Sequence, residues 1–195
     1  MQSEYFVLER AASNEHPLLG WAQPSGVFYK GKAVDVTEPV RLRLGAPVPA
    51  NPVMVDHHSL PEPVVSPRVK AVLEPLELHR VQLVPADVKM GENDVRRYWL
   101  VHVFNEIPAL DMEQSVVEWV SEEGGLIFAI EKLVLKEKVL EELPLSQRQV
   151  FVLAEDSSMY LVHGSVVDQV MALKPAVEGF RFIPVEQWNV AAPFR

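Results

Sequence analysis

The residues best suited to chemistry are an aspartate and two histidines in a row, Asp56-His57-His58. Carboxylate and imidazole groups both bind zinc and manganese, so this triplet is the strongest candidate for a metal site. Neighbouring residues of an extended chain point to opposite sides, however, and no HxH or HxxxH spacing adds a further ligand. The pattern therefore favours a polar loop over a metal centre.

Three further histidines, His79, His102 and His163, lie in or beside predicted strands. A histidine in such a position more often completes a hydrogen bond in the core or at a sheet edge than acts as a base. His102 shares a strand face with Tyr98 and Leu100, and we expect it to be buried.

The carboxylate pair Glu122-Glu123 directly precedes the turn Gly124-Gly125. Solvent would surround both carboxylates at such a turn, so no difference in environment would separate their pKa values, as an acid–base pair requires. The sequence has no GxSxG, GxGxxG or HExxH motif and no P-loop, and its nine glycines form no phosphate-binding loop. The absence of cysteine excludes thiolate chemistry and disulfides. We therefore predict that the protein is not an enzyme and uses no metal or cofactor.

Composition narrows the possible partners. The chain has 195 residues, 48% of them hydrophobic, which is sufficient for one well-buried domain. Its net charge of −9 argues against nucleic acid as a ligand, because phosphate binding requires clustered Lys and Arg. No apolar segment approaches the ~18 residues of a membrane span, and the acidic start of the chain is unlike a secretory signal. We expect a soluble cytoplasmic protein without a membrane partner.

Residues 1–63 differ from the rest because they contain half of the 16 prolines. Proline lacks a backbone donor and has a fixed φ, so long helices and central strands are disfavoured there. Short strands are predicted at 4–8, 27–29 and 40–44. We predict a proline-rich lobe of β and irregular structure, or an arm that wraps on the body.

Residues 64–195 have the pattern of an α+β domain, with a mixed or antiparallel sheet and a few short helices. One helix is predicted after Ser66-Pro67, where a cap residue precedes a proline at the first helical position, and another after Ser165. The segment 97–104 is apolar on both faces, which is typical of a central strand. The other strands are predicted at 81–84, 126–130, 149–154, 159–162 and 180–185.

The two helix–strand units of the body have equal length. Ser66 begins a helix and Pro85 ends the following strand nineteen residues later, and Ser165 and Pro184 have the same separation. Equal units suggest equivalent places on one sheet, although any short helix–strand unit of this size would look alike.

Acidic residues concentrate between 111 and 142, a segment that contains nine carboxylates and only three lysines. A negative face would attract a basic partner by electrostatic steering. The carboxylates of this face are Glu113, Glu118, Glu122 and Glu123. Near the C-terminus, Trp188 and Phe194 are candidates either for a partner contact or for docking onto the body.

Three motifs follow one another along the body. They are Val65-Ser66-Pro67-Arg68-Val69 with Val81–Val88, then Tyr98–Phe104 with Ile107-Pro108-Ala109-Leu110-Asp111 and Ser115, and finally Val150-Phe151-Val152-Leu153 with the Ser165 helix and Gly179-Phe180-Arg181-Phe182. In their order and spacing, these motifs resemble immunity protein family eleven of bacterial polymorphic toxin systems, formerly a domain of unknown function. The resemblance covers about residues 60–188, and residues 1–63 match only loosely.

The resemblance implies a protein that binds and neutralises a cognate toxin encoded by a neighbouring gene, and it implies no catalytic residues. A homodimer is left open. One alternative is an effector adaptor or chaperone of a secretion system, which would bind several partners. Another is a metal-dependent hydrolase that uses His57 or His58.

Overall fold

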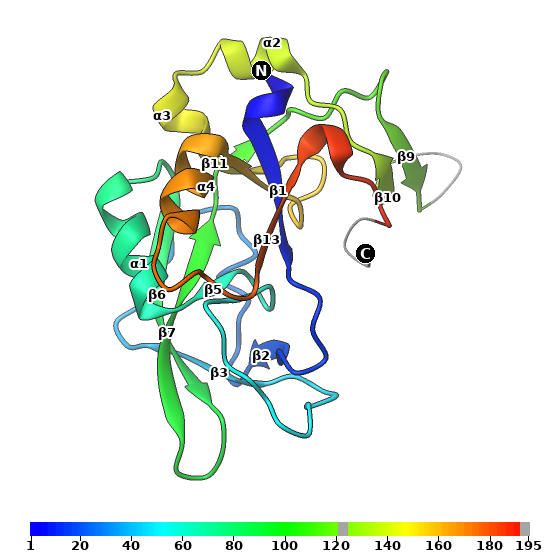
Figure 1. The fold of residues 1–195 in the computed structure, drawn as a ribbon. Coiled ribbons are helices and arrows are strands. Elements are labelled where there is room, and N and C mark those ends of the chain that lie inside the picture. Colours follow the sequence, from blue (N-terminus) through cyan, green and yellow to red (C-terminus); the bar gives the residue numbers. More distant parts are fainter. Residues whose placement is uncertain (121–124, 192–195) are drawn as a thin grey trace.

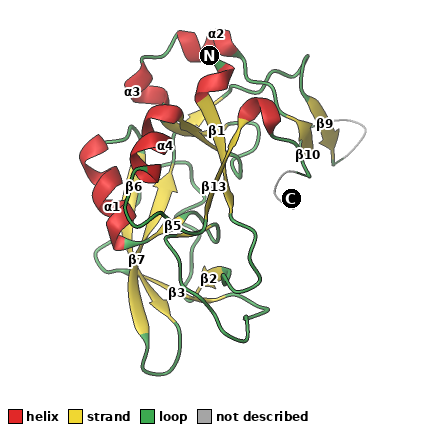
Figure 2. Ribbon diagram, in the orientation of Figure 1, coloured by secondary structure: helices red, strands yellow, loops and turns green. Residues whose placement is uncertain are grey.

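Two sheets, a projecting hairpin and short helices make up the fold of the computed structural model, which describes residues 1–120 and 125–191 (Figures 1 and 2). Both larger sheets mix parallel and antiparallel pairs. The protein therefore has an α+β fold with mixed sheets, which confirms the predicted fold class. No helix within these ranges is long and apolar enough to cross a bilayer.

The larger sheet is built around a long antiparallel hairpin. Its spatial order is β2 (Leu19–Trp21), β3 (Val40–Leu44), β6 (Val81–Lys89), β7 (Val95–Val103), β5 (Val64–Val65) and β4 (His57–His58). The hairpin strands β6 and β7 pair along their whole length, and β3 adds to β6 in parallel. Phe28, Leu42 and Leu100 belong to the apolar cluster that packs on this sheet.

The five-stranded sheet joins the beginning and the end of the described chain. Its spatial order is β13 (Phe180–Pro184), β1 (Tyr5–Arg10), β12 (Tyr160–His163), β11 (Val150–Leu153) and β8 (Glu106–Ile107). β1 lies between β12 and β13 and pairs antiparallel with both. Residues 1–63 thus supply β1 to this sheet and β2, β3 and β4 to the other.

The helices are short, and two of them contact each other. They are η1 (Gln2–Glu4), α1 (Pro67–Leu73), η2 (Glu74–Leu76), α2 (Glu137–Glu141), α3 (Leu145–Arg148), α4 (Gly164–Met171) and η3 (Val185–Gln187). α1 and α4 lie side by side in Figure 1. Val69 of α1 and Val166 of α4 share a buried cluster with Val101 of β7 and Val152 of β11. This cluster connects both helices to both sheets.

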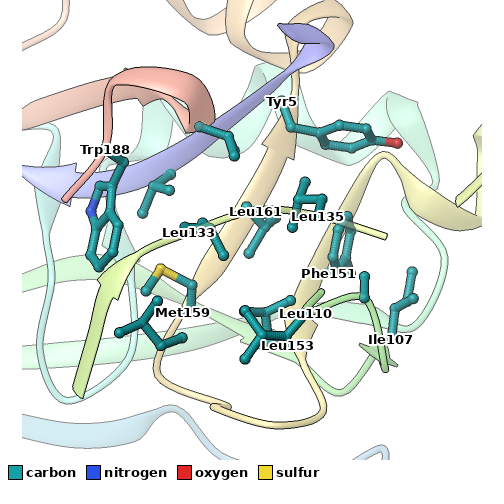
Figure 3. Close-up of a cluster of buried hydrophobic side chains, with 14 of the residues drawn as sticks. Tyr5, Ile107, Leu110, Leu133, Leu135, Phe151, Leu153, Met159, Leu161 and Trp188 are labelled. Atoms are coloured by element: carbon teal, nitrogen blue, oxygen red, sulfur yellow. The ribbon is translucent and has the colours of Figure 1, made fainter. Parts of the chain in front are cut away.

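A further cluster fills the other face of the five-stranded sheet (Figure 3). Phe151 and Leu161 of the sheet are covered by Leu133 and Leu135, which follow the projecting hairpin. Side chains alternate along a strand, so β1 contributes to both clusters. Tyr5 lies in this cluster, and its neighbour Phe6 packs against the cluster under α1 and α4.

The projecting hairpin consists of β9 (Val116–Trp119) and β10 (Ile127–Lys132), which form a two-stranded sheet of their own. Val, Ile, Phe and Trp favour pleated strands, which explains why this segment is extended. Gly125 has a φ of 110°, a conformation that favours glycine, at the point where the chain enters β10.

Most strands predicted in the body are confirmed, including the central strand at 97–104 and the hairpin of β11 and β12. The prediction that Pro85 ends a strand is wrong, because β6 continues to Lys89. β3 pairs with β6 only from Ala86 onward, so the missing N–H of Pro85 interrupts no ladder on that side. The prediction of a strand at 27–29 is also wrong, since Phe28 N–H donates to Ser25 O and closes a turn.

The two helix–strand units do not occupy equivalent places on one sheet. β6 is an inner strand of the six-stranded sheet, whereas β13 is an edge strand of the other. The predicted caps also differ from expectation. Ser66 precedes α1, but its hydroxyl donates to Asp56 and does not accept a hydrogen bond from the helix. The residue that caps α4 is His163, because its Nδ1 accepts from Ser165 N–H.

Candidate functional site

The outer face of the β9–β10 hairpin is apolar although it does not face the core. Val116, Val120, Leu126 and Phe128 are 47%, 62%, 72% and 69% exposed. Val120 N–H donates to Leu126 O, and side chains alternate along each strand, so these four share one face. Scattered exposed hydrophobic residues are normal, but a contiguous group marks a contact surface. We call these four residues the hairpin face.

The opposite side of the hairpin rests on the body. Ile130 is 2% exposed in the cluster of Figure 3, and Val117 and Ile127 pack against the same cluster. A bulge after Ile127 places Phe128 and Ala129 together opposite Glu118. The bulge keeps Ile130 in the core while Phe128 remains exposed.

Carboxylates surround the hairpin face. Glu118 lies on β9 between Val116 and Val120, and it is exposed. Glu113 is exposed in the turn before β9, where its N–H donates to the Asp111 carboxylate at 3.0 Å. The surface thus combines apolar side chains with negative charge, which suits a partner that is itself apolar and basic at its contact.

Two neighbouring pockets share part of their lining, and of the two only the second is also lined by described residues of the β9–β10 hairpin. Ser59, Leu60, Ser158 and Tyr160 line both of them. The His102 pocket, of about 280 Å³, is lined in addition by Phe28, Glu62, His102 and Glu106. The His57 pocket, of about 330 Å³, is lined in addition by Glu9, His57, Ile130, Asp156 and Trp188.

His102 and Glu62 form a buried ion pair beside the first pocket. His102 Nδ1 lies 3.1 Å from Glu62 Oε2, and its Nε2 lies 3.0 Å from Lys32 O. Both ring nitrogens therefore face acceptors, an arrangement that favours the protonated ring. Burial lowers the pKa of His102, but the hydrogen bonds to Glu62 and Lys32 outweigh it and raise the pKa above its usual value.

His57 and His58 are each only 2% exposed, so the prediction of a polar loop is wrong. His57 Nδ1 donates to Gly179 O at 3.1 Å, and its ring stacks on Phe180. His58 Nδ1 donates to Pro17 O at 2.9 Å on the other side of β4. Burial lowers the pKa of both histidines to about 4, despite these hydrogen bonds. Both are therefore neutral at pH 7.

Asp56 connects three segments of the chain. Its carboxylate accepts from Ser66 Oγ at 2.7 Å, from Arg68 Nη2 at 2.7 Å and from Glu178 N–H at 3.0 Å. Arg68 also donates to the carbonyl oxygens of Pro175 and Ala176. Burial alone would raise the pKa of Asp56, but hydrogen bonds from Arg68, Ser66 and Glu178 outweigh it and lower the pKa to about 2.

Gly179 allows β4 to approach the loop before β13. Its φ is 86°, and a Cβ atom there would lie 2.3 Å from His57 O. No side chain fits this space, so the close approach that buries His57 requires glycine. Within residues 1–120 and 125–191, no three His, Asp or Glu side chains gather as metal ligands would.

The chain matches the immunity protein family (Imm11) over residues 5–187, which is nearly its whole length. It belongs to the Imm11 family. A search of curated proteins finds none that matches it. Membership indicates an immunity function against toxins, as the resemblance of the body motifs implied, and it extends the likeness into the proline-rich segment that matched only loosely.

The predicted partner residues of the Imm11 protein fall into three groups. Glu113 and Glu118 are exposed beside the hairpin face. Glu122, Glu123 and Phe194 lie outside the described residues. Trp188 is 7% exposed and packs in the core, where its Nε1 donates to Glu9 Oε1 at 3.1 Å. Of the two roles considered for Trp188, a partner contact and docking onto the body, the structure therefore favours docking.

The remaining predicted candidates have structural roles in the Imm11 protein. His102 is buried as expected, His163 caps α4, and His79 is exposed. Sequence reasoning missed the hairpin face, because Val116 and Val120 on one strand and Leu126 and Phe128 on the next lie in nearly continuous apolar runs, where no alternation separates exposed from buried positions.

Acid is expected to destabilise the Imm11 protein through His58. Its pKa is about 4 when folded and near 6.5 when unfolded, so the unfolded chain binds the proton more readily and stability falls as pH drops from 6.5 towards 4. Between pH 7 and 5.5 the loss amounts to ~1 kcal/mol for this residue. His58→Asn keeps a donor for Pro17 O but does not titrate. Urea denaturation should therefore show that the variant loses ~1 kcal/mol less unfolding free energy than the wild type between pH 7 and 5.5. The exposed His79→Asn should retain the wild-type loss; equal curves for all three proteins would contradict the assignment.

Proposed function

We propose that this Imm11 protein neutralises a cognate toxin by binding it directly through the hairpin face. The observation that carries the proposal is the exposure of Leu126 and Phe128, two large apolar side chains that are 72% and 69% exposed next to Val120 at 62%. Specific interfaces contain a fully desolvated apolar centre and a polar rim. Leu126 and Phe128 provide such a centre, Glu118 lies on the same face between Val116 and Val120, and Glu113 provides a carboxylate for the rim.

The proposed partner is the product of a neighbouring gene, and the proposed place of action is the cytoplasm. Because carboxylates lie on and beside the hairpin face, the toxin surface that meets them is expected to be basic. Binding by itself neutralises a toxin when it covers the active site or the surface that enters the target. The proposal requires no catalysis by the immunity protein.

Co-expression with the toxin from the neighbouring gene tests this function. The immunity protein should restore growth of cells that express the toxin, and the two chains should co-purify as a stable complex. Rescue without a complex would overturn direct binding, and absence of both would overturn the immunity function towards that toxin. Capture of secretion-machine components in place of the toxin would favour the adaptor alternative.

Charge reversal beside the hairpin face should slow association. In the double variant Glu113→Lys, Glu118→Lys, the steering attraction is lost, and we expect about a tenfold lower association rate constant at low ionic strength. The difference should shrink at high salt, because ions screen exposed charges. Stopped-flow or surface-based kinetics at two salt concentrations measures both effects.

The matched control is Glu141→Lys, Glu142→Lys, which makes the same change in net charge at the exposed end of α2. It should alter the association rate much less. If the two double variants associate equally fast, the toxin approaches another face of the molecule.

A further inference from the structure

The His57 pocket is rich in hydrogen-bond acceptors. Two carboxylates, Glu9 and Asp156, line it together with Ser59, Ser158 and Tyr160, and the Ser158 hydroxyl donates to Asp156 Oδ1 at 2.6 Å. None of the described residues that line it is a lysine or an arginine. A pocket with this lining favours a ligand that carries several donors and a positive charge.

His57 contributes an acceptor that has no donor. Its Nδ1 carries the proton that is shared with Gly179 O, so Nε2 of the neutral ring holds a lone pair. Nε2 is buried and has no hydrogen-bond partner. An unpaired polar atom in such a position is costly, and a donor from a ligand would satisfy it.

Glu9 has a similar deficit. Only one hydrogen bond reaches its carboxylate within the described chain, from Trp188 Nε1 to Oε1. Burial raises the pKa of Glu9, and the Trp188 indole and Arg181 offset only part of that effect. Arg181 faces Glu9 across the β1–β13 ladder, but the two groups form no ion pair within 4.0 Å. A cation in the pocket would compensate the buried carboxylate.

The remaining walls are apolar. Leu60, Ile130, Met159 and the indole of Trp188 line the same pocket. Such walls fit the methylene stem of a long basic side chain, and the face of an indole attracts its charged head. The lining therefore matches an arginine or lysine side chain better than a compact inorganic cation.

We propose that the His57 pocket binds the cationic side chain of an arginine or lysine of the partner protein. The location supports this occupant, since Ala129 and Ile130 of β10 form one wall of the pocket. Ile130 lies on the body side of β10, opposite the hairpin face, so a toxin seated on that face would extend a basic side chain past the edge of β10 to reach Glu9. The identity of the occupant rests on the proposed function, whereas the preference of the pocket for a cation does not.

A titration of the purified full-length protein with N-acetylarginine amide tests the pocket. The amide should bind with a Kd on the order of 1 mM, which is what a ligand of this size reaches in a partly formed site. The Trp188 indole N–H and the backbone amides of Ser158 and Tyr160 should shift in proton–nitrogen correlation spectra. N-acetylcitrulline amide has the same shape without the charge and should cause at most one tenth of the saturation.

Conservative variants decide whether the pocket carboxylates are responsible. Glu9→Gln keeps an acceptor for Trp188 Nε1, and Asp156→Asn keeps an acceptor for Ser158 N–H. Each should weaken arginine amide binding roughly tenfold, because a charged acceptor becomes neutral. Glu141→Gln on the exposed surface of α2 should bind like the wild type. Equal shifts with the citrulline amide, or wild-type affinity in both pocket variants, would overturn the proposal.

The outcome is separable from that of the toxin experiment. The arginine amide is added to the protein alone, so its failure to bind refutes the cation pocket and leaves growth rescue unaffected. Failure of growth rescue, with the amide still bound, refutes the proposed function and leaves a pocket with a cation preference.

Discussion

The Asp56→Ala variant is expected to lose about 1–3 kcal/mol of unfolding free energy, the usual cost of leaving hydrogen-bond donors around a largely buried group without their acceptor. The carboxylate is the common acceptor for Ser66, Arg68 and Glu178, and these donors lose it together. Urea denaturation followed by circular dichroism measures the change, which should appear as a lower midpoint with an unchanged slope.

An exposed ion pair is the matched control for Asp56. Asp94 and Arg96 form a similar pair at 2.9 Å, but both side chains are 48% exposed. Solvent screens such a pair, so Asp94→Ala should leave the midpoint close to that of the wild type. If the two alanine variants have the same midpoint, the Asp56 network does not stabilise the fold.

The Phe128→Asp variant should lose toxin binding while the fold remains intact. Phe128 is 69% exposed, so the change removes little from the core, but in a complex it would bury an unpaired carboxylate at the centre of the interface. We expect at least a hundredfold weaker Kd, which corresponds to the ~3 kcal/mol typical of a central hot spot. Isothermal titration calorimetry with the purified toxin measures it, and growth rescue should fail in parallel.

Val95→Asp provides the control for Phe128→Asp. Val95 is an apolar strand residue with 58% exposure at the end of β7, far in sequence from the hairpin face. This variant should bind the toxin like the wild type. Wild-type affinity in Phe128→Asp would mean that the hairpin face is not the contact surface, and equal weakening in both variants would indicate a non-specific effect of charge.

Local patterns predicted the larger elements correctly. The strand at 97–104 has apolar residues on both faces, and β7 lies inside the six-stranded sheet between β5 and β6. The helix after Ser66 begins with proline at its first position, which is a purely local signal. Elements of two residues, such as β4, β5 and β8, have no periodicity of their own. β5 and β8 form beside the longer strands β7 and β11, and β4 in turn pairs with β5.

The burial of His57 and His58 could not be predicted, because the groups that bury them are distant in sequence. Gly179 O and Phe180 cover His57 on one side of β4, and Pro17 O accepts from His58 on the other. Two adjacent histidines look like a polar loop until these segments are in place. The one local prediction that holds is that the two rings point to opposite sides.

The acidic character of the candidate site was visible in the sequence, whereas its apolar centre was not. Counting charges between 111 and 142 directs attention to Glu113 and Glu118. The bulge after Ile127 breaks the regular alternation, so Ile130 enters the core and Phe128 does not. A strict alternation of side chains, continued through the bulge, would place Phe128 and Ile130 on the same face, which is incorrect.

The position of β1 has a consequence for the time at which the protein becomes active. β1 pairs with β12 and β13, which are separated from it by most of the chain, and its side chains serve two core clusters. On the ribosome, β1 must therefore wait until β12 and β13 have emerged before its sheet can close. Folds dominated by such distant pairs form slowly. If the proposed toxin is made at the same time, protection has to come from molecules completed earlier, so a standing supply of immunity protein would matter more than rapid new synthesis.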